Sequence, residues 1–183
     1  MSEPERGVPL KMPLPLERWH AYQGQSNDCG PCSVAIAANA LLGQAAVDPQ
    51  ALAREMDARG LPERIPGWVM FPWALVAAFR RMGLSARWRV GVREARLWRN
   101  LHAGAVTVVV VGQPLRFKGR RWEGWSHYKV LHAWDPERGW GFIDPARRVG
   151  DSAWQAALEF RRQWTLMGRQ IIELRGNPPD GIG

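Results

Sequence analysis

A continuous apolar run near the start of the sequence predicts a buried helix. Residues 34–42 contain a single polar side chain, Asn39, so a helix over 29–42 would be apolar on most of its sides. A polar residue among 26–28 is suited to cap its first turn, and Gly43 supplies a stop signal. We expect this helix to lie at the centre of the fold.

Proline and glycine mark two further helices, and the pattern then changes from helix to strand. These helices begin at Pro49 and Pro72 and end at Gly60 and Gly83. Beyond them, the β-branched run 105–111 is typical of a buried strand. The other predicted elements are a strand over 84–90, a helix over 93–102, a loop over 112–125, strands over 126–134 and 140–143, a helix over 152–164 and a strand over 169–174. Helices first and strands second indicate an α+β fold.

Length and punctuation indicate a single domain. The chain has 183 residues, enough for one sizeable core. We predict an extended proline-rich arm over 1–18, the domain over 19–175, and a flexible glycine- and proline-rich tail over 176–183. No apolar run approaches the roughly 18–20 residues that cross a bilayer, and the N-terminus lacks the apolar stretch of a signal peptide. We therefore expect no membrane span and a cytoplasmic protein.

The formal net charge of +8 raises the question of an anionic partner. The 22 arginines and 3 lysines are scattered along the sequence rather than clustered. Arginine doublets in such a pattern are typical of solvated faces, so we do not expect nucleic acid as a partner.

Both cysteines of the chain lie in the tetrapeptide Cys-Gly-Pro-Cys at 29–32, which fits three chemistries. A C-x-x-C serves as a redox dithiol, as half of a zinc site, or as a catalytic thiol with a second cysteine nearby. Thioredoxin carries the same tetrapeptide, but residues 21–28 are polar and lack the strand that leads into a thioredoxin motif. A zinc site would need His127 and His132, which begin 95 positions beyond Cys32 and would point to opposite faces of a strand. We expect no metal.

The sequence contains candidates for every group that a nucleophilic thiol requires: a general base, an orienting carboxylate and oxyanion donors. Cys29 lies in the first turn of the predicted buried helix, where the helix dipole favours the thiolate anion. His127 opens a predicted strand and is a candidate general base, and Asp144 ends the partner strand, where a carboxylate can orient the imidazole. The Cys29 amide and a side-chain amide, from Gln23 or Gln25, would stabilise an oxyanion.

Taken together, these motifs resemble the papain-like cysteine peptidases. The resemblance is nearest to the bacterial branch with the bacteriocin-processing, double-glycine leader peptidases and their stand-alone relatives. It covers about residues 20–165 and rests on four motifs in the family's order: Gln23-x₅-Cys29, Cys29-Gly30-Pro31-Cys32-Ser33, His127-Tyr128-Lys129-Val130 and Asp144-Pro145. Leader-processing peptidases are commonly fused to a membrane exporter, which this sequence does not encode, so the resemblance bears on fold and nucleophile more than on substrate.

The resemblance implies a fold and a reaction. The fold would be a papain-like α+β fold, with Cys29 at a helix N-terminus in a helical half and His127 and Asp144 in an antiparallel sheet half. The family's glutamine six residues before the cysteine corresponds to Gln23, in preference to Gln25. The implied activity is thiol-dependent cleavage of a peptide or amide bond through a Cys-His-Asp triad and an acyl-enzyme, with a peptide or protein substrate and no cofactor.

Three alternatives remain open at this point. The same triad can pass the acyl group to an amine or a second thiol, which would make the protein an acyltransferase. A non-catalytic peptide-binding module of the same fold, and a thioredoxin-like oxidoreductase, are the others. Cys32, one helical turn from Cys29, is interpreted as a small core residue rather than a resolving thiol.

Overall fold

The centre of the protein is an antiparallel sheet. The computed structural model describes residues 8–119 and 121–175. Strands in the main sheet follow the order β4-β9-β5-β6-β7-β8, and β1 pairs with β6 outside this path. These strands are β1 (Leu10–Lys11), β4 (Ser85–Arg89), β5 (Val106–Lys118), β6 (Arg121–Asp135), β7 (Gly139–Ile143), β8 (Ala153–Gln155) and β9 (Ile171–Arg175). A separate small sheet consists of β2 (Arg64–Ile65) and β3 (Val69–Met70).

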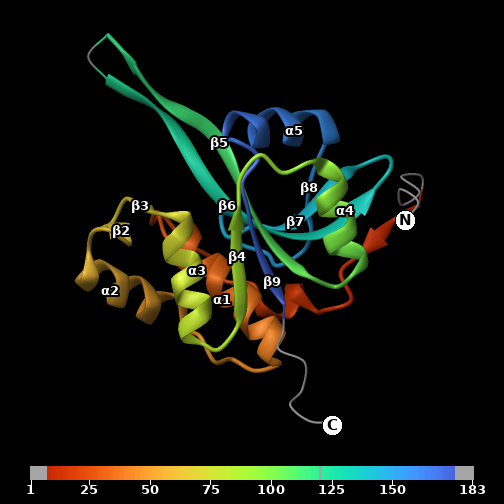
Figure 1. Ribbon diagram of the computed structural model, residues 1–183, viewed down its shortest axis with the longest axis horizontal. Coiled ribbons are helices and arrows are strands. Elements are labelled where there is room, and N and C mark those ends of the chain that lie inside the picture. Colours follow the sequence, from red (N-terminus) through yellow and green to blue (C-terminus); the bar gives the residue numbers. More distant parts are fainter. Residues whose placement is uncertain (1–7, 120, 176–183) are drawn as a thin grey trace.

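Helices cover both sides of the long strands. They are the 3₁₀ helix η1 (Leu16–Trp19), α1 (Cys29–Leu42), α2 (Pro49–Arg59), α3 (Pro72–Arg81), α4 (Glu94–His102) and α5 (Ala157–Leu166). Helix α1 packs against β5 and β6, and α5 packs against β5 and β7. Figure 1 shows α1 and α5 on opposite sides of these strands. The predicted α+β fold is confirmed, with α1 to α3 forming the helical part beside the sheet.

The helix signals of the sequence are confirmed in the structure. Helix α1 covers 29–42 and ends before Gly43, and eleven of its fourteen residues are buried. Helix α2 begins at Pro49, and the Asp48 carboxylate caps it by accepting the Ala51 N–H at 2.6 Å. Helix α3 begins at Pro72. Within the described residues, α1 is the longest helix, and no helix there is long and apolar enough to traverse a lipid bilayer.

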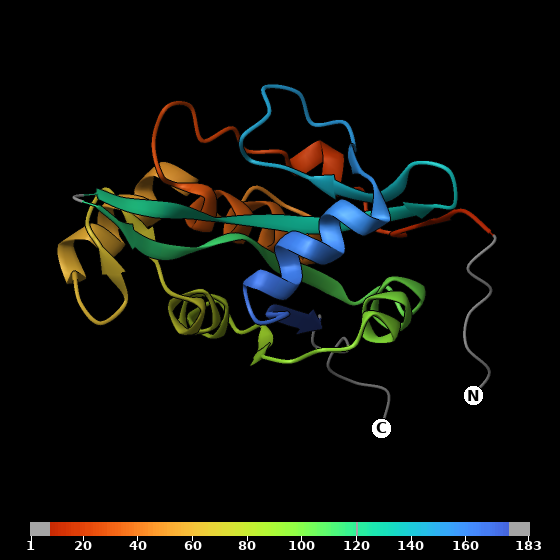
Figure 2. The same cartoon turned by 90° about the horizontal axis from the view of Figure 1, so that it is seen from above.

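The prediction of a loop over 112–125 is wrong. Strands β5 and β6 continue through this segment as a long hairpin, with Gly112 opposite Ser126 and Arg116 opposite Glu123, and one register shift between them. Both faces of a two-stranded ribbon meet solvent, so its residues need not alternate between apolar and polar as a half-buried strand does. Figures 1 and 2 show this hairpin extending toward the end of the molecule that carries β2 and β3.

The helix predicted over 152–164 is partly wrong. Residues Ala153–Gln155 form strand β8, which pairs with β7, and α5 begins only at Ala157. Pairing to the free edge of β7 supplies backbone hydrogen bonds that local helix propensity cannot anticipate.

The predicted arm and tail are described only in part. The whole tail, 176–183, and residues 1–7 of the arm lie outside the described residues. In the rest of the arm, β1 pairs with β6, and Met12 and Leu16 are buried in the main core. The domain boundaries at 19 and 175 stay a prediction.

Tryptophans form much of the core beneath α4 and α5. Trp98, Trp134 and Trp140 contact one another with ring centroids 4.5–5.0 Å apart. Phe160 of α5 extends this cluster and stacks on Trp164 at 5.4 Å. Aromatic packing in this part of the core therefore accounts for four of the eleven tryptophans in the sequence.

Candidate active site

Cys29 is the first residue of α1, and its side chain is partly exposed. The next residue, Gly30, packs closely against β3: a Cβ there would lie 2.7 Å from the Met70 sulfur and 3.0 Å from the Met70 Cβ, so the Met70 side chain would have to shift. Asp28, at the N-cap position, makes no capping hydrogen bond to the helix. Its carboxylate instead accepts a hydrogen bond from Arg64 Nη2 at 2.6 Å.

Register in the sheet brings His127 and Asp144 together. Val130 of β6 pairs with Ile143 of β7, so Asp144, just beyond β7, lies beside the residues that precede Val130 in β6. His127 Nε2 is 2.6 Å from Asp144 Oδ1. The other imidazole nitrogen, Nδ1, is left for a different partner, and Cys29 lies near enough to His127 to help raise the pKa of the imidazole.

Asp144 contacts two other groups in addition to His127. Its Oδ1 also accepts the Ala146 N–H at 2.9 Å, and Lys129 Nζ lies 3.0 Å from Oδ2. His127 and Lys129 are two residues apart in β6 and therefore face the same side of the strand. The carboxylate is thus fixed between two side chains of one strand and a backbone amide.

These contacts shift the protonation of both groups. Burial of the His127 ring opposes its positive charge, but hydrogen bonds to Asp144 and Cys29 outweigh that effect and raise the pKa of His127 to about 9. Burial also opposes the charge of Asp144, yet His127 and Lys129 hold the pKa of Asp144 well below its usual value. The pair is therefore an imidazolium and a carboxylate at neutral pH.

Gln23 lies on the loop before α1 and is attached to the sheet half. Its backbone N–H donates to Pro145 O at 2.9 Å, directly after Asp144. Its side-chain Nε2 donates to Ser26 O at 3.0 Å, which fixes the orientation of the amide. One N–H of this group remains for another acceptor, and Gln23 lines the same cleft as Cys29 and His127. Gln25 is exposed and does not line that cleft.

The cleft around Cys29 has a volume of about 550 Å³ and is mostly apolar. One wall is the segment of β2 and β3, and the other is the base of the hairpin of β5 and β6. Tyr128 OH links the walls by donating to Met70 O at 2.8 Å. Apolar and aromatic side chains that line the cleft include those of Trp68, Met70, Phe71, Pro114, Trp125 and Met167. Trp68 and Trp125 are 53% and 44% exposed, so they border its opening.

The structure therefore brings the four residues selected from the sequence to one cleft. Cys29, His127 and Gln23 line it, and Asp144 contacts His127 from behind. Sequence reasoning missed Lys129 and Arg64. Lys129 lies in the quoted His127-Tyr128-Lys129-Val130 motif, and its spacing of two from the histidine was the available signal. Nothing local in the sequence indicates that Arg64, 36 positions from Asp28, contacts it.

Cys32 and His132 are separate from this arrangement. Burial, and the nearby charges of Asp28 and Cys29, raise the pKa of the Cys32 thiol to about 12, so it stays protonated at neutral pH. His132 is buried between Ser152, at 2.7 Å, and Glu17, at 3.2 Å. The described residues contain no group of three or more histidine, cysteine or acidic side chains placed to hold a metal ion.

Comparison with known proteins identifies the fold. No protein-family model matches the sequence, and no curated protein matches it either. Among solved structures, a C39-like peptidase from Bacillus anthracis has 19% sequence identity and a TM-score of 0.68, over 91% of this chain and 98% of the other. The peptidase domain of Streptococcus ComA, a bifunctional ABC transporter of a quorum-sensing pathway, has 20% identity and a TM-score of 0.57, over 86% and 97% of the two chains.

The protein thus has a papain-like α+β fold. More specifically, the fold is that of the C39-like peptidases, which correspond to the bacteriocin-processing branch that the sequence motifs resemble.

Proposed function

We propose that the protein is a papain-like cysteine peptidase that cleaves a peptide or amide bond in a peptide or protein substrate. The observation that carries this proposal is the chain of contacts from the Asp144 carboxylate through the His127 imidazole to the Cys29 thiol, at a cleft of about 550 Å³. A peptide-binding module or a redox dithiol does not require a charged histidine beside a cysteine at a helix N-terminus.

In the proposed first step, Cys29 Sγ attacks the scissile carbonyl carbon as the thiolate. His127, protonated on Nδ1, gives that proton to the leaving nitrogen as the C–N bond breaks, and a thioester remains on Cys29. Asp144 keeps Nε2 hydrogen-bonded, which holds the ring in the orientation that this transfer needs.

The carbonyl oxygen carries negative charge in the tetrahedral intermediate. The Cys29 backbone N–H belongs to the first turn of α1 and has no acceptor within the helix, so it is available to that oxygen. The free N–H of Gln23 is the proposed second donor. Water then attacks the thioester, His127 takes its proton, and the thiolate leaves with the acid product released.

The test compares single variants on a mixture of peptides, with products read by mass spectrometry. Cys29→Ala should abolish cleavage, a loss of about 10⁴-fold or more. The matched control Cys32→Ala removes the neighbouring sulfur and should leave cleavage within a few-fold of wild type. Cleavage that survives Cys29→Ala would refute the peptidase.

Adding a primary amine to the same assay separates hydrolysis from acyl transfer. A peptidase gives products carrying one added water, whereas an acyltransferase gives products carrying the amine. A protein that binds peptides, cleaves none of them, and binds equally well after Cys29→Ala would be a binding module.

A further inference from the structure

A second hollow lies on the sheet away from the cleft, and arginine side chains surround it. It has a volume of about 190 Å³ and shares no lining residue with the cleft around Cys29. Strands β4 and β9 form its floor, and α4 forms one side. The residues that line it are Ser85, Arg87, Arg89, Arg96, Glu173 and Arg175.

Strand alternation places these residues on one face. Ser85, Arg87 and Arg89 are two apart along β4 and point to the same side of the sheet. In the antiparallel pairing with β9, Ser85 lies opposite Arg175 and Arg87 lies opposite Glu173. This face of the edge strand therefore carries Arg87 and Arg89, and Arg175 of β9 lies beside Ser85.

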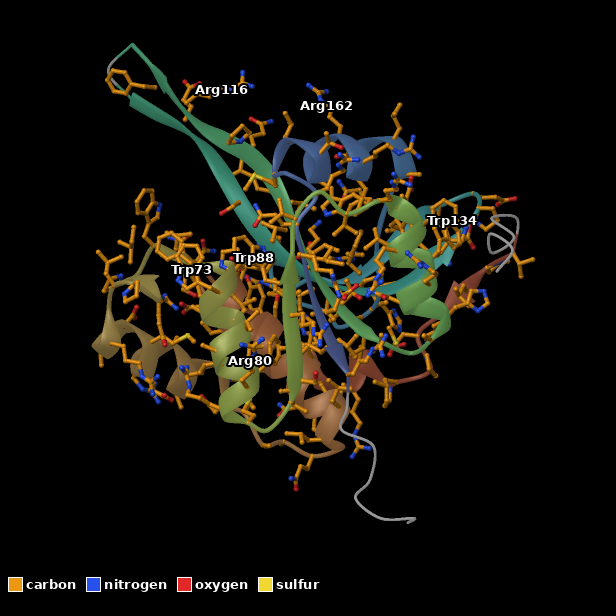
Figure 3. The ribbon with its side chains drawn as sticks, viewed as in Figure 1. Trp73, Arg80, Trp88, Arg116, Trp134 and Arg162 are labelled. Carbon is orange, nitrogen blue, oxygen red and sulfur yellow. The ribbon has the colours of Figure 1, made fainter. Side chains whose placement is uncertain are left out.

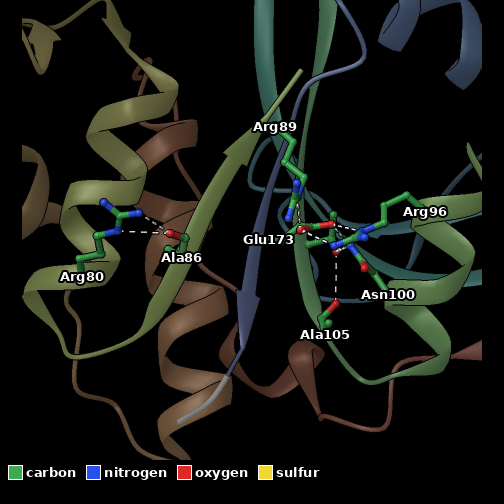
Figure 4. Close-up of polar contacts among 8 residues, drawn as sticks. Arg80, Ala86, Arg89, Arg96, Asn100, Ala105 and Glu173 are labelled. Carbon is green, nitrogen blue, oxygen red and sulfur yellow. Dashed lines mark hydrogen bonds and ion pairs between the residues drawn. The ribbon is translucent and has the colours of Figure 1, made fainter. Parts of the chain in front are cut away.

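Glu173 holds two of the arginines in fixed positions. Its carboxylate is almost buried and lies 2.5 Å from Arg89 Nε, 2.5 Å from Arg96 Nε and 2.9 Å from Arg96 Nη2, and Asn100 Nδ2 donates to it at 3.0 Å. Figure 4 shows Arg89, Arg96 and Asn100 converging on this carboxylate from β4 and α4. Burial opposes the charge, but the donors, Arg96 first, lower the pKa of Glu173 to about 2. Glu173 is thus ionised at any physiological pH.

The hydrogen bonds to Glu173 leave several guanidinium nitrogens of Arg89 and Arg96 available to another acceptor. Arg89 binds Glu173 through Nε alone, so both of its terminal nitrogens are free to donate, and Arg96 retains Nη1. Among the described residues, Arg87 and Arg175 have no carboxylate partner. Four guanidinium groups against one carboxylate leave the hollow with an excess of three positive charges.

We propose that this hollow is a binding site for a phosphate group, free or carried by a small phosphorylated molecule. Guanidinium forks match the geometry of phosphate oxygens and bind them through paired, charge-assisted hydrogen bonds. The hollow is smaller than the roughly 300 Å³ at which pockets for drug-sized ligands begin, so it fits a phosphate group rather than a whole nucleotide. The Ser85 hydroxyl is a further donor on the same face.

The proposal is tested by calorimetric titration of the intact protein with inorganic phosphate, pyrophosphate and glucose 6-phosphate, at constant ionic strength set with chloride. One saturable site is expected. Binding of free phosphate or pyrophosphate alone points to the free anion, and tighter binding of the sugar phosphate points to a phosphorylated metabolite. No saturable binding of any of the three overturns the proposal.

Variants separate a built site from diffuse attraction to a basic chain. Arg87→Gln should weaken binding about tenfold, the loss expected for one charged hydrogen bond. The charge-matched control is Arg162→Gln on α5, whose side chain points away from the body of the protein in Figure 3, and it should bind as wild type does. Equal weakening in both variants would mean that only net charge matters and would refute the site.

Glu173→Gln is a second test, because a built site and diffuse attraction predict opposite changes in phosphate affinity for this variant. It adds one unit of positive charge, so diffuse attraction predicts tighter binding. The built site predicts weaker binding, because Arg89 and Arg96 lose the carboxylate that orients them. Thermal unfolding without ligand shows whether this variant is folded, and Arg87→Gln decides the question if it is not. Cys29→Ala should bind phosphate normally, so this proposal and the proposed peptidase activity stand or fall separately.

Discussion

Replacement of Arg64 by methionine should destabilise the protein more than any change on the exposed surface. The Arg64 side chain is 1% exposed, its Nη2 hydrogen-bonds Asp28 at 2.6 Å, and its Nε is 2.7 Å from Asp57 in an ion pair without hydrogen-bond geometry. Methionine keeps the aliphatic part of the side chain and removes the charge. Two carboxylates then remain near each other with no cation between them.

The expected cost follows from the burial of the three groups. Removing one partner of a buried ion pair costs about 3–5 kcal/mol. Asp28 and Asp57 are 24% and 36% exposed, so water compensates part of the loss and the lower end of that range applies, about 3 kcal/mol. This is a large fraction of the roughly 5–15 kcal/mol that stabilises a typical domain.

Urea unfolding followed by tryptophan fluorescence measures this cost, provided that the slope of the transition is unchanged. Asp57→Asn is the matched control: it removes the more exposed contact, which lacks hydrogen-bond geometry, and should cost less than about 1 kcal/mol. Asp28→Asn should fall between the two. If Arg64→Met cost less than about 1 kcal/mol, or no more than Asp57→Asn, the buried ion pair between Arg64 and Asp28 would not stabilise the fold as argued from its burial.

Arg64 also bears on the thiol. Without it, Asp28 is free to turn toward the first amides of α1, and its charge next to Cys29 is no longer balanced. Alkylation of Cys29 by iodoacetamide at pH 7 should therefore be slower in folded Arg64→Met than in Asp57→Asn. Equal rates would limit the effect of Arg64 to stability.

Three more predictions concern the histidine pair and one glycine. Asp144→Asn should lower the pKa of His127 from about 9 toward or below 6.5, as seen by NMR titration of the imidazole, because the burial cost remains and the carboxylate is gone; a pKa still near 9 would contradict this. Since the folded pKa of His127 exceeds its unfolded value, its charge stabilises the fold fully below about pH 6.5, and this contribution disappears as the pH rises through 9. The difference in unfolding free energy between wild type and Asp144→Asn should accordingly shrink from pH 6 to pH 10, and a constant difference would exclude the ion pair. Gly139→Ala should cost at least about 2 kcal/mol in urea unfolding, because φ is +87° and the new Cβ would lie 2.3 Å from Gln155 O; Gly60→Ala, with φ +62° and open space around the new Cβ, is the milder control.

Local punctuation was sufficient for the first three α-helices and for the residues at their ends. Proline at a helix start and glycine after its end act within a few residues, so α1, α2 and α3 follow from the sequence nearly to the residue. The order of motifs also selected Cys29 and His127, which line one cleft in the structure. These are features that a chain encodes close to the position where they act.

The elements that sequence reasoning missed depend on distant partners. The hairpin of β5 and β6 is strand because each half supplies the other with hydrogen bonds, although its glycine, proline and arginine content is typical of a loop. Strand β8 forms only because β7 offers it an edge. Likewise, Arg64 reaches Asp28 because β3 comes close to α1 at Gly30 and Met70, which no pattern in either segment specifies.

The candidate site joins two halves that are rigid for different reasons. Cys29 is fixed by a helix that is buried almost throughout, whereas His127 and Asp144 are fixed by register between β6 and β7. Helix α1 packs directly on β6, so the distance from thiol to imidazole is set by core side chains between these two elements rather than by a surface loop. Gln23 lies on the loop before α1, and its backbone hydrogen bond to Pro145 connects that loop to the sheet half. Substitutions in the α1–β6 contact should therefore alter the reactivity of Cys29 without touching any residue of the site.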